Sequence, residues 1–264
     1  MILFLPARDG KLIHMLYSRG LGRLPHVIEE SDLYPSDAGG RISHMDGSRE
    51  ASRLTRMRKA PAQSFPLIRR LRRSELPDNT IRLARYLIGK TLVHELPQGR
   101  LSGRIVETEA YPVGDAAGHA FRGETPSIRS LFLARGYAYV YFTYGSCFMM
   151  NVSSEGPGVG AGVLLRALEP LEGIRFMERR RGTHRLLDLA RGPGRLAQAM
   201  DIDKRYDGAD LCAGGKLWLG SAVRRRAGQI GASIRIGITR DVHLLHRFYE
   251  CESPFVSGPK RLRE

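Results

Sequence analysis

The chain has 264 residues, with 42 lysines and arginines against 27 aspartates and glutamates, and a formal net charge of +15. Because each phosphate contact releases counterions, this charge favours a polyanionic partner, with nucleic acid ahead of an anionic membrane surface. A transmembrane span is excluded because no run of about 18 apolar residues occurs. Residues 1–6 are too short an apolar stretch for a secretion signal, so we expect an intracellular, cytoplasmic protein.

Three cysteines, Cys147, Cys212 and Cys251, are odd in number and widely separated. This pattern matches neither a disulfide framework nor a clustered zinc site, so we interpret them as reduced packing residues. The histidines also lack accompanying cysteines or aspartates at the spacing of metal ligands. The sequence therefore predicts no metal and no cofactor.

Residues 1–74 show no sustained hydrophobic period, are interrupted by turn-forming residues such as Pro25, and become strongly basic after residue 52. Such a composition is typical of a poorly ordered segment. We expect a poorly ordered basic extension at 1–74 and a folded domain at 75–264. Two interpretations of the extension are open: it is a DNA-binding arm, or translation truly begins at Met45 or Met57.

The first regular elements follow Pro77, where Asp78 or Asn79 can cap a helix running toward Gly89. Either side chain can accept hydrogen bonds from the first backbone N–H groups of a helix. Residues 101–111 predict a strand with alternating faces. Alternation places on one face Ile105, Glu107, Glu109 and Tyr111, and on the other Val106, Thr108 and Ala110.

Residues 137–143 and 147–153 are rich in β-forming residues, so they predict a hairpin with Tyr144 at its exposed turn. Another strand is predicted at 162–168. Helices are predicted at 171–181, with Leu171, Ile174 and Met177 inward, and from Pro193 to Met200, because proline suits a first helical turn. Many strands with few long helices between them favour an α+β fold.

Two charged residues of these strands are candidates for a functional site. Breaking an N-glycosidic bond develops positive charge on the sugar, which an ionised carboxylate can stabilise while it activates water, and Glu109 is the best candidate. The alternative is that Glu107 and Glu109 form a solvated strand face. Arg166 lies in an apolar strand and needs an anion there. Glu109 or a DNA phosphate could supply it, and so could a structural salt bridge to Glu107 or Glu169.

An enzyme acting on a base inside duplex DNA must first take that base out of the stack, and an inserted side chain can fill the gap. Tyr144 at a hairpin tip suits this wedge. Tyr111, His119 and Tyr141 could supply the aromatic faces of a pocket for the extruded purine. The alternatives are core packing for residues 139–142 and a backbone-bonded loop histidine for His119.

Four segments carry a specific resemblance: RIVETEAY at 104–111, YVYFTYG at 139–145, MNVSS at 150–154 and VLLRALEPLEG at 163–173. Together they resemble the alkyladenine (3-methyladenine) DNA glycosylase family, and the similarity runs from about residue 76 to 258. The resemblance implies a single α+β domain with a curved antiparallel sheet flanked by helices. That fold is itself similar to the C-terminal domain of methionyl-tRNA formyltransferases.

The resemblance also implies an activity: hydrolysis of 3-methyladenine, 7-methylguanine, hypoxanthine and etheno-adenine from double-stranded DNA, without metal or cofactor, leaving an abasic site. A lyase step would need an amine nucleophile, and no lysine lies in these motifs. By resemblance Glu109 activates the water and Arg166 helps to fix it, while Tyr144 intercalates. The implied base pocket comprises Tyr111, His119, Tyr141 and Asn151, which disfavours guanine, with a wall of Leu131, Leu164 and Ile236.

Two other classes of protein fit part of this pattern. A non-catalytic binder of lesions would share the basic surface and Tyr144 but would not depend on Glu109. An RNA-binding module would share the fold, although the formyltransferase domain lacks the set of Glu109, Tyr141 and Arg166. The sequence marks no protein partner, so a monomer is the default expectation.

Overall fold

The computed structural model describes residues 67–143, 145–222 and 227–262. Most of the predicted extension, and with it Met45 and Met57, lies outside the described residues. The end of the extension belongs to the sheet, because strand β1 (Ile68–Arg70) pairs with β7 (Leu217–Ala222). The open interpretations of the extension therefore stay predictions.

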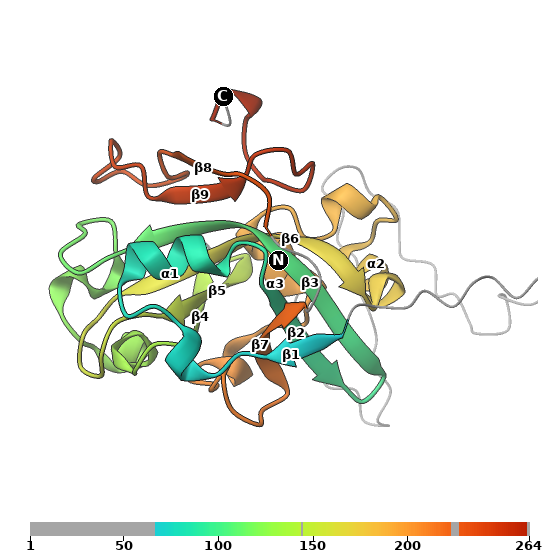
Figure 1. Ribbon diagram of the computed structural model, residues 1–264, viewed down its shortest axis with the longest axis horizontal. Coiled ribbons are helices and arrows are strands. Elements are labelled where there is room, and N and C mark those ends of the chain that lie inside the picture. The colour runs from blue at the N-terminus through green and yellow to red at the C-terminus, as the bar shows by residue number, and fades with distance from the viewer. Residues whose placement is uncertain (1–66, 144, 223–226, 263–264) are drawn as a thin grey trace, which may run out of the picture. The chain divides into compact units, whose positions relative to one another are not determined.

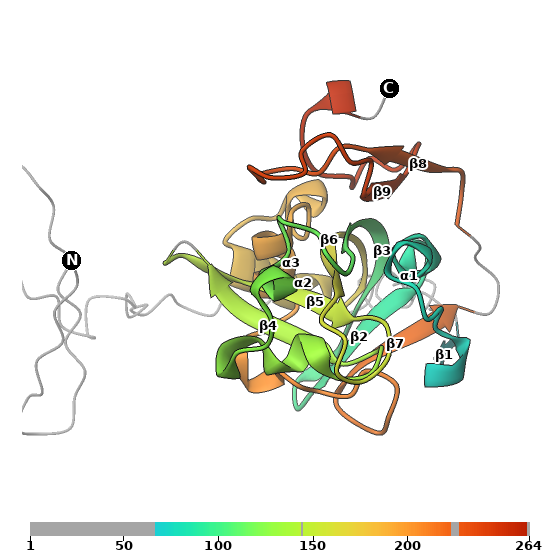
Figure 2. The same ribbon diagram turned by 90° about the vertical axis from the view of Figure 1, so that its left-hand side faces the viewer.

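The described residues form one antiparallel sheet of nine strands (Figure 1). Its main path runs β1-β7-β2-β3-β6-β5-β4, so β1 and β4 lie at opposite ends of the sheet (Figure 2). Strand β9 pairs with β3 and β8 pairs with β9. The remaining bounds are β2 (Thr91–Leu96), β3 (Gly99–Tyr111), β4 (Ala138–Thr143), β5 (Cys147–Ser153), β6 (Gly162–Glu172), β8 (Ile230–Ser233) and β9 (Arg247–Glu250).

Three α-helices accompany the sheet in the described part of the chain: α1 (Thr80–Leu87), α2 (Ile174–Arg181) and α3 (Pro193–Ala199). Helix α1 lies against β3 and β6, and α3 lies against β5, β6 and α2. None of the helices in the described residues has the length and apolar character needed to cross a membrane. The predicted α+β fold with an antiparallel sheet is confirmed.

Short 3₁₀ helices fill the connections: η2 (Arg73–Glu75), η3 (His119–Arg122), η4 (Pro126–Phe132), η5 (Leu186–Asp188), η6 (Lys204–Tyr206) and η7 (Lys260–Leu262).

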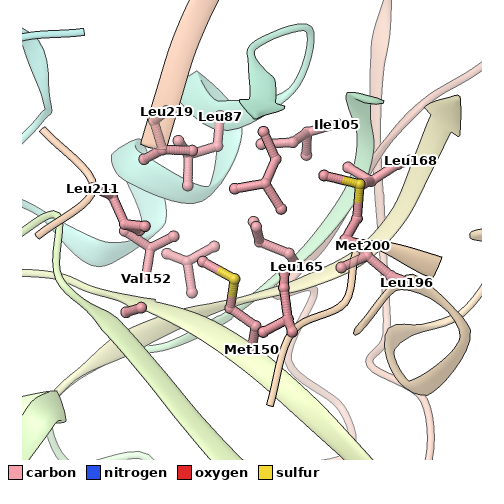
Figure 3. Close-up of a cluster of buried hydrophobic side chains, with 14 of the residues drawn as sticks. Leu87, Ile105, Met150, Val152, Leu165, Leu168, Leu196, Met200, Leu211 and Leu219 are labelled. Atoms are coloured by element: carbon pink, nitrogen blue, oxygen red, sulfur yellow. The ribbon is translucent and has the colours of Figure 1, made fainter. Parts of the chain in front are cut away.

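The main hydrophobic core joins side chains from both helices and strands. Figure 3 shows Leu87 of α1, Ile105 of β3, Met150 of β5, Leu165 of β6 and Leu196 of α3 in one cluster. All five are essentially inaccessible to solvent. Burial of each such side chain stabilises the fold by roughly 1.5–3 kcal/mol, so this core fixes the strands that carry the polar site.

The predicted alternation along residues 101–111 is wrong at its centre. Val106 has no partner on β6, because Ile105 pairs with Leu168 and Glu107 with the preceding residue, Ala167. This bulge turns Ile105 into the main core, whereas Val106 packs in a smaller cluster with Ala167. The extra residue of a bulge shifts the faces of a strand by one position, which strict alternation cannot anticipate. The prediction that Glu107, Glu109 and Tyr111 share a face is unaffected.

The boundary between β6 and α2 also differs from the prediction. Strand β6 continues to Glu172, which pairs with Ser102, so Leu171 lies in the strand and not in the helix. The helix begins at Ile174, after Gly173 with φ of 74°. Glycine takes this left-handed conformation without steric cost, which allows the abrupt change from strand to helix. Met177 is buried, as predicted.

The cap of α1 yields a stability prediction. The Asn79 side chain accepts a hydrogen bond from the Arg82 backbone N–H at 3.1 Å, so Asn79 and not Asp78 is the N-cap. We expect Asn79→Ala to lower the free energy of unfolding by about 1 kcal/mol, measured by urea denaturation. Asp78→Ala is the matched control and should stay within about 0.5 kcal/mol. Equal losses in both variants would contradict this assignment.

Candidate active site

Glu107 of β3 is the centre of a buried polar network. Its Oε1 accepts hydrogen bonds from the Nε atoms of Arg166 at 2.8 Å and Arg247 at 2.7 Å. Ser257 completes the shell: its backbone N–H donates to Oε2 at 2.6 Å and its hydroxyl to Oε1 at 3.0 Å. The carboxylate of Glu107 therefore joins β3 to β6, to β9 and to the segment that follows β9.

Burial alone would raise the pKa of Glu107, but the positive charges of Arg166 and Arg247 outweigh it and hold that pKa below its ordinary value. Burial would lower the pKa of Arg166, yet the carboxylates of Glu109 and Glu107 raise it. Both groups are therefore ionised at neutral pH. A buried charge is tolerated when it is paired and hydrogen-bonded in this way.

Glu109 lies two residues further along β3 and shares the same arginine. Its Oε1 is 3.2 Å from Nη1 of Arg166 and accepts the backbone N–H of Ile236 at 2.8 Å. Its Oε2 accepts a hydrogen bond from the Tyr111 hydroxyl at 3.0 Å. The Glu109 side chain is 0% exposed, so neither acid forms the solvated strand face that the alternative interpretation required. Arg166 bridges both acids, while Glu169 pairs with Arg104.

A cavity of about 490 Å³ borders this charge network at Arg166. Its volume lies within the range of roughly 300–1,000 Å³ typical of small-molecule sites. Glu109 is not among the residues that line it, but Arg166, Tyr111 and Ile236, which bond to Glu109, all are. The remaining residues of the predicted base pocket also line the cavity: His119, Tyr141, Asn151, Leu131 and Leu164.

Aromatic rings cover one part of the cavity. Tyr139 and Tyr141 are stacked, with ring centroids 5.2 Å apart, and His119 meets Tyr141 edge-on at 4.5 Å. The His119 Nδ1 atom is 2.9 Å from the Tyr139 hydroxyl, so this histidine is bonded to a side chain and not to a loop backbone. Burial lowers the pKa of His119 below its ordinary value, which favours the neutral ring. Tyr141 fits both interpretations given for it, because it packs against the buried cluster that contains Tyr139 and also lines the cavity.

Neighbouring strands position the polar wall of the cavity. Asn151 of β5 lies between Tyr139 of β4 and Leu164 of β6 in the sheet register. Its side chain is buried at the cavity wall and presents an amide to whatever fills it. The turn of the β4–β5 hairpin includes Tyr144, which lies outside the described residues, so its role as a wedge stays a prediction.

The sequence interpretation missed several residues that support the site. Arg247 and Ser257 hold Glu107, and Arg235 packs over the ring of Tyr111 at 4.6 Å. A usable signal existed for the two arginines, since each is a charged residue inside a short apolar or β-forming run. Within the described ranges, no three of the His, Cys, Asp and Glu side chains lie in positions that could hold a metal ion. All three cysteines are free.

Comparisons with known proteins identify the family of the chain. The family described as Methylpurine-DNA glycosylase (MPG) matches residues 74–254. A protein of Mesorhizobium japonicum named "Putative 3-methyladenine DNA glycosylase" is 65% identical over 192 residues, 73% of this chain and 92% of the relative. A protein of the same name from Paraburkholderia phytofirmans is 52% identical over 206 residues, 78% of this chain and 94% of the relative.

The chain belongs to the methylpurine-DNA glycosylase family, as the sequence motifs predicted. It is therefore a DNA glycosylase, a DNA-binding hydrolase of N-glycosyl bonds that acts in base excision repair.

The Glu107 network yields the second stability prediction. Glu107→Gln leaves two buried guanidinium groups with one carboxylate fewer, so we expect the free energy of unfolding to fall by about 3–5 kcal/mol at neutral pH. Urea denaturation measures this loss, and Glu95→Gln on the surface of β2 is the control. Because the folded-state pKa of Glu107 is lowered, its contribution is present above the unfolded pKa of about 4.3 and is lost at lower pH.

The difference in the free energy of unfolding between wild type and Glu107→Gln should therefore become smaller as the pH falls below about 4.3. A difference that stayed constant across that range would show that the Glu107 carboxylate contributes no charge interaction to stability.

Proposed function

We propose that this protein flips damaged purines, namely 3-methyladenine, 7-methylguanine, hypoxanthine and etheno-adenine, out of double-stranded DNA and hydrolyses their N-glycosidic bonds. The reaction leaves an abasic site and includes no lyase step. One observation carries the proposal: an aromatic cavity lined by Arg166, whose guanidinium pairs with two buried carboxylates, Glu107 and Glu109. The lining of this cavity, within the described residues, contains no lysine that could form a Schiff base.

The purine ring would enter between the aromatic side chains. Tyr111 and the edge-on pair of His119 and Tyr141 offer the π-faces on which a planar, often cationic, alkylated base stacks. Burial raises the pKa of Tyr139, so its hydroxyl stays protonated and can donate a hydrogen bond to Nδ1 of His119. Nε2 of His119 then carries the ring proton and offers an N–H donor to an acceptor on the base.

Glu109 would supply the hydrolytic step. It accepts a proton from water, the water oxygen bonds to the anomeric carbon, and the glycosidic bond breaks with its electron pair leaving on the base. The negative charge of Glu109 also stabilises the oxocarbenium character of the sugar. Arg166 fixes the carboxylate from one side and the Ile236 N–H fixes it from another, so Oε2 is the oxygen available for water.

The buried position of Glu109 sets a requirement on this reaction. Oε2 is covered by the Tyr111 hydroxyl at 3.0 Å, so a water must reach the second lone pair of that oxygen beside the hydroxyl. A small rotation of the Tyr111 ring on base binding would open this space. Tyr111 would then act both as a stacking surface and as the cover that keeps the carboxylate dry until a base is bound.

The duplex would be held by positive charge and by the β4–β5 hairpin. Near Pro193 at the cavity wall, Arg185, Arg191 and Arg195 lie around the single carboxylate of Asp188, so this surface has excess positive charge for phosphates. Tyr144 would fill the gap left by the flipped nucleotide. The Asn151 amide would meet the exocyclic amine of normal guanine and disfavour it. Leu131, Leu164 and Ile236 would complete the apolar wall.

The catalytic role of Glu109 predicts a separation of binding from chemistry. Glu109→Gln keeps the shape of the side chain but removes the carboxylate that would accept the proton from water. The single-turnover rate of hypoxanthine release should therefore fall by at least about 10²-fold. Binding to lesion-containing duplex should stay tight, since Tyr111 and His119 still contact the base. Oligonucleotides with one defined lesion, followed by alkaline cleavage and a gel-shift titration, measure both quantities.

Glu95→Gln, in the surface pair with Arg100, is the control and should excise at the wild-type rate. If Glu109→Gln released hypoxanthine as fast as the wild type, another group would have to activate water. If the wild type bound lesions tightly without releasing any base, the non-catalytic alternative would hold.

The hydrogen bond between Tyr139 and His119 predicts an effect on lesion preference. Tyr139→Phe removes the donor that fixes the His119 tautomer, so release of hypoxanthine, whose O6 accepts a hydrogen bond, should slow by about threefold to tenfold. Release of 3-methyladenine, which has an amino group at that position, should change less. Parallel single-turnover assays of the two lesions test this expectation, and an equal loss for both would contradict it.

A further inference from the structure

A second buried ion pair lies beside the candidate active site, outside the set of residues assigned above. The side chains of Arg235 and Asp115 are both 0% exposed. Nη2 of Arg235 donates to Oδ1 of Asp115 at 3.0 Å, and Nη1 donates to Oδ2. Asp115 belongs to the loop after β3 and Arg235 to the loop after β8, so the pair joins two loops that both line the cavity.

Arg235 also supports the ring that covers the catalytic carboxylate. Its guanidinium lies 4.6 Å from the centroid of the Tyr111 ring, and its Nη1 donates to the backbone carbonyl of Ala110 at 3.0 Å. Tyr111 lines the cavity whereas Arg235 does not, so the guanidinium supports Tyr111 from outside the cavity. A cation at this distance from an aromatic face is attracted to it, which restricts the tilt of the ring.

The same pair also holds the segment that donates a backbone hydrogen bond to Glu109. Ile236, the residue directly after Arg235, donates its backbone N–H to Oε1 of Glu109 at 2.8 Å. On the other side, Asp115 accepts the backbone N–H of Ala117 at 2.9 Å and shapes the loop that leads to His119. Arg235 and Asp115 therefore fix the ring above the carboxylate, one hydrogen bond to the carboxylate and the loop that carries His119.

Stability alone does not account for this arrangement. Removing two charges from water costs free energy that their attraction often fails to recover, and apolar residues frequently replace buried ion pairs without loss of stability. What an apolar pair cannot provide is a directed set of bonds to Ala110, Ala117 and the Tyr111 ring. Catalytic geometry is sensitive to displacements of about 1 Å, so such bonds have a direct effect on rate.

We propose that Arg235 and Asp115 are positioning residues for base excision, acting through Tyr111 and Glu109. The inference rests on the proposed function of Glu109. It assigns the pair to the rate of the hydrolytic step more than to the affinity for DNA. Affinity for the duplex comes largely from phosphate contacts, and the arginines around Asp188 that would make them do not contact the pair.

The test compares two buried arginines of similar environment. Arg235→Met removes the positioning pair, and Arg104→Met removes the ion pairs of Arg104 with Glu169 and Glu250, away from the cavity. Arg235→Met should lower the single-turnover rate of hypoxanthine release by about tenfold to hundredfold, with the Kd for lesion duplex changed by less than about threefold. Arg104→Met should lower the melting temperature but leave the rate unchanged.

Two further variants keep the test decisive if Arg235→Met does not fold. Arg235→Lys retains the charge but not the planar fork, and it should recover part of the rate. Asp115→Asn keeps the size of the side chain, and like Arg235→Met it should lower the single-turnover rate of hypoxanthine release. A wild-type rate in a folded Arg235 or Asp115 variant would overturn the inference, as would an equal loss of rate in Arg104→Met.

The failure of this inference can be told apart from failure of the proposed function. If Glu109→Gln is inactive while the Arg235 variants excise normally, only the positioning role is wrong. If Glu109→Gln itself excises normally, the catalytic assignment is wrong and the role of Arg235 falls with it.

Discussion

The site depends on one constraint, the pairing of Arg166 with two carboxylates in the interior of the sheet. A guanidinium buried there alone would be costly, and so would either acid. Arg247 brings a second guanidinium to Glu107, and the backbone N–H groups of Ser257 and Ile236 donate further hydrogen bonds to the two carboxylates. Removing a member leaves a buried charge with fewer partners, so we expect substitutions in the network to lower the free energy of unfolding.

Two bulges bring this network about. Val106 is the extra residue on β3, and Arg166 is the extra residue on β6, because Glu107 pairs with Ala167 while Thr108 pairs with Leu165. Bulges redirect side chains beside active sites, and here they aim the guanidinium at both acids. At the same place β3 exchanges its neighbour β2 for β9, which carries Arg247. The sheet irregularity and the charge network are thus one structural feature.

The cavity combines a rigid wall with loop-borne groups. Strands β4, β5 and β6 supply Tyr141, Asn151 and Leu164 in a fixed register. His119 and Ile236 lie in connecting segments, which the buried pair of Arg235 and Asp115 ties to the end of β3. Groups that must be precise are thereby held by strands or by ion pairs, which is what a dry, preorganised site requires.

Local sequence patterns were enough to predict the capped helix, the β4–β5 hairpin, the strand with Glu107, Glu109 and Tyr111 on one face, and the membership of the family. These depend on residues close together in the chain. The partners of the buried charges could be identified only from the folded chain, because Glu107 contacts Arg166 across 59 positions and Arg247 across 140. The burial of Glu109 could likewise be identified only there, since exposure depends on where Tyr111 and Arg166 pack and not on the period of the strand.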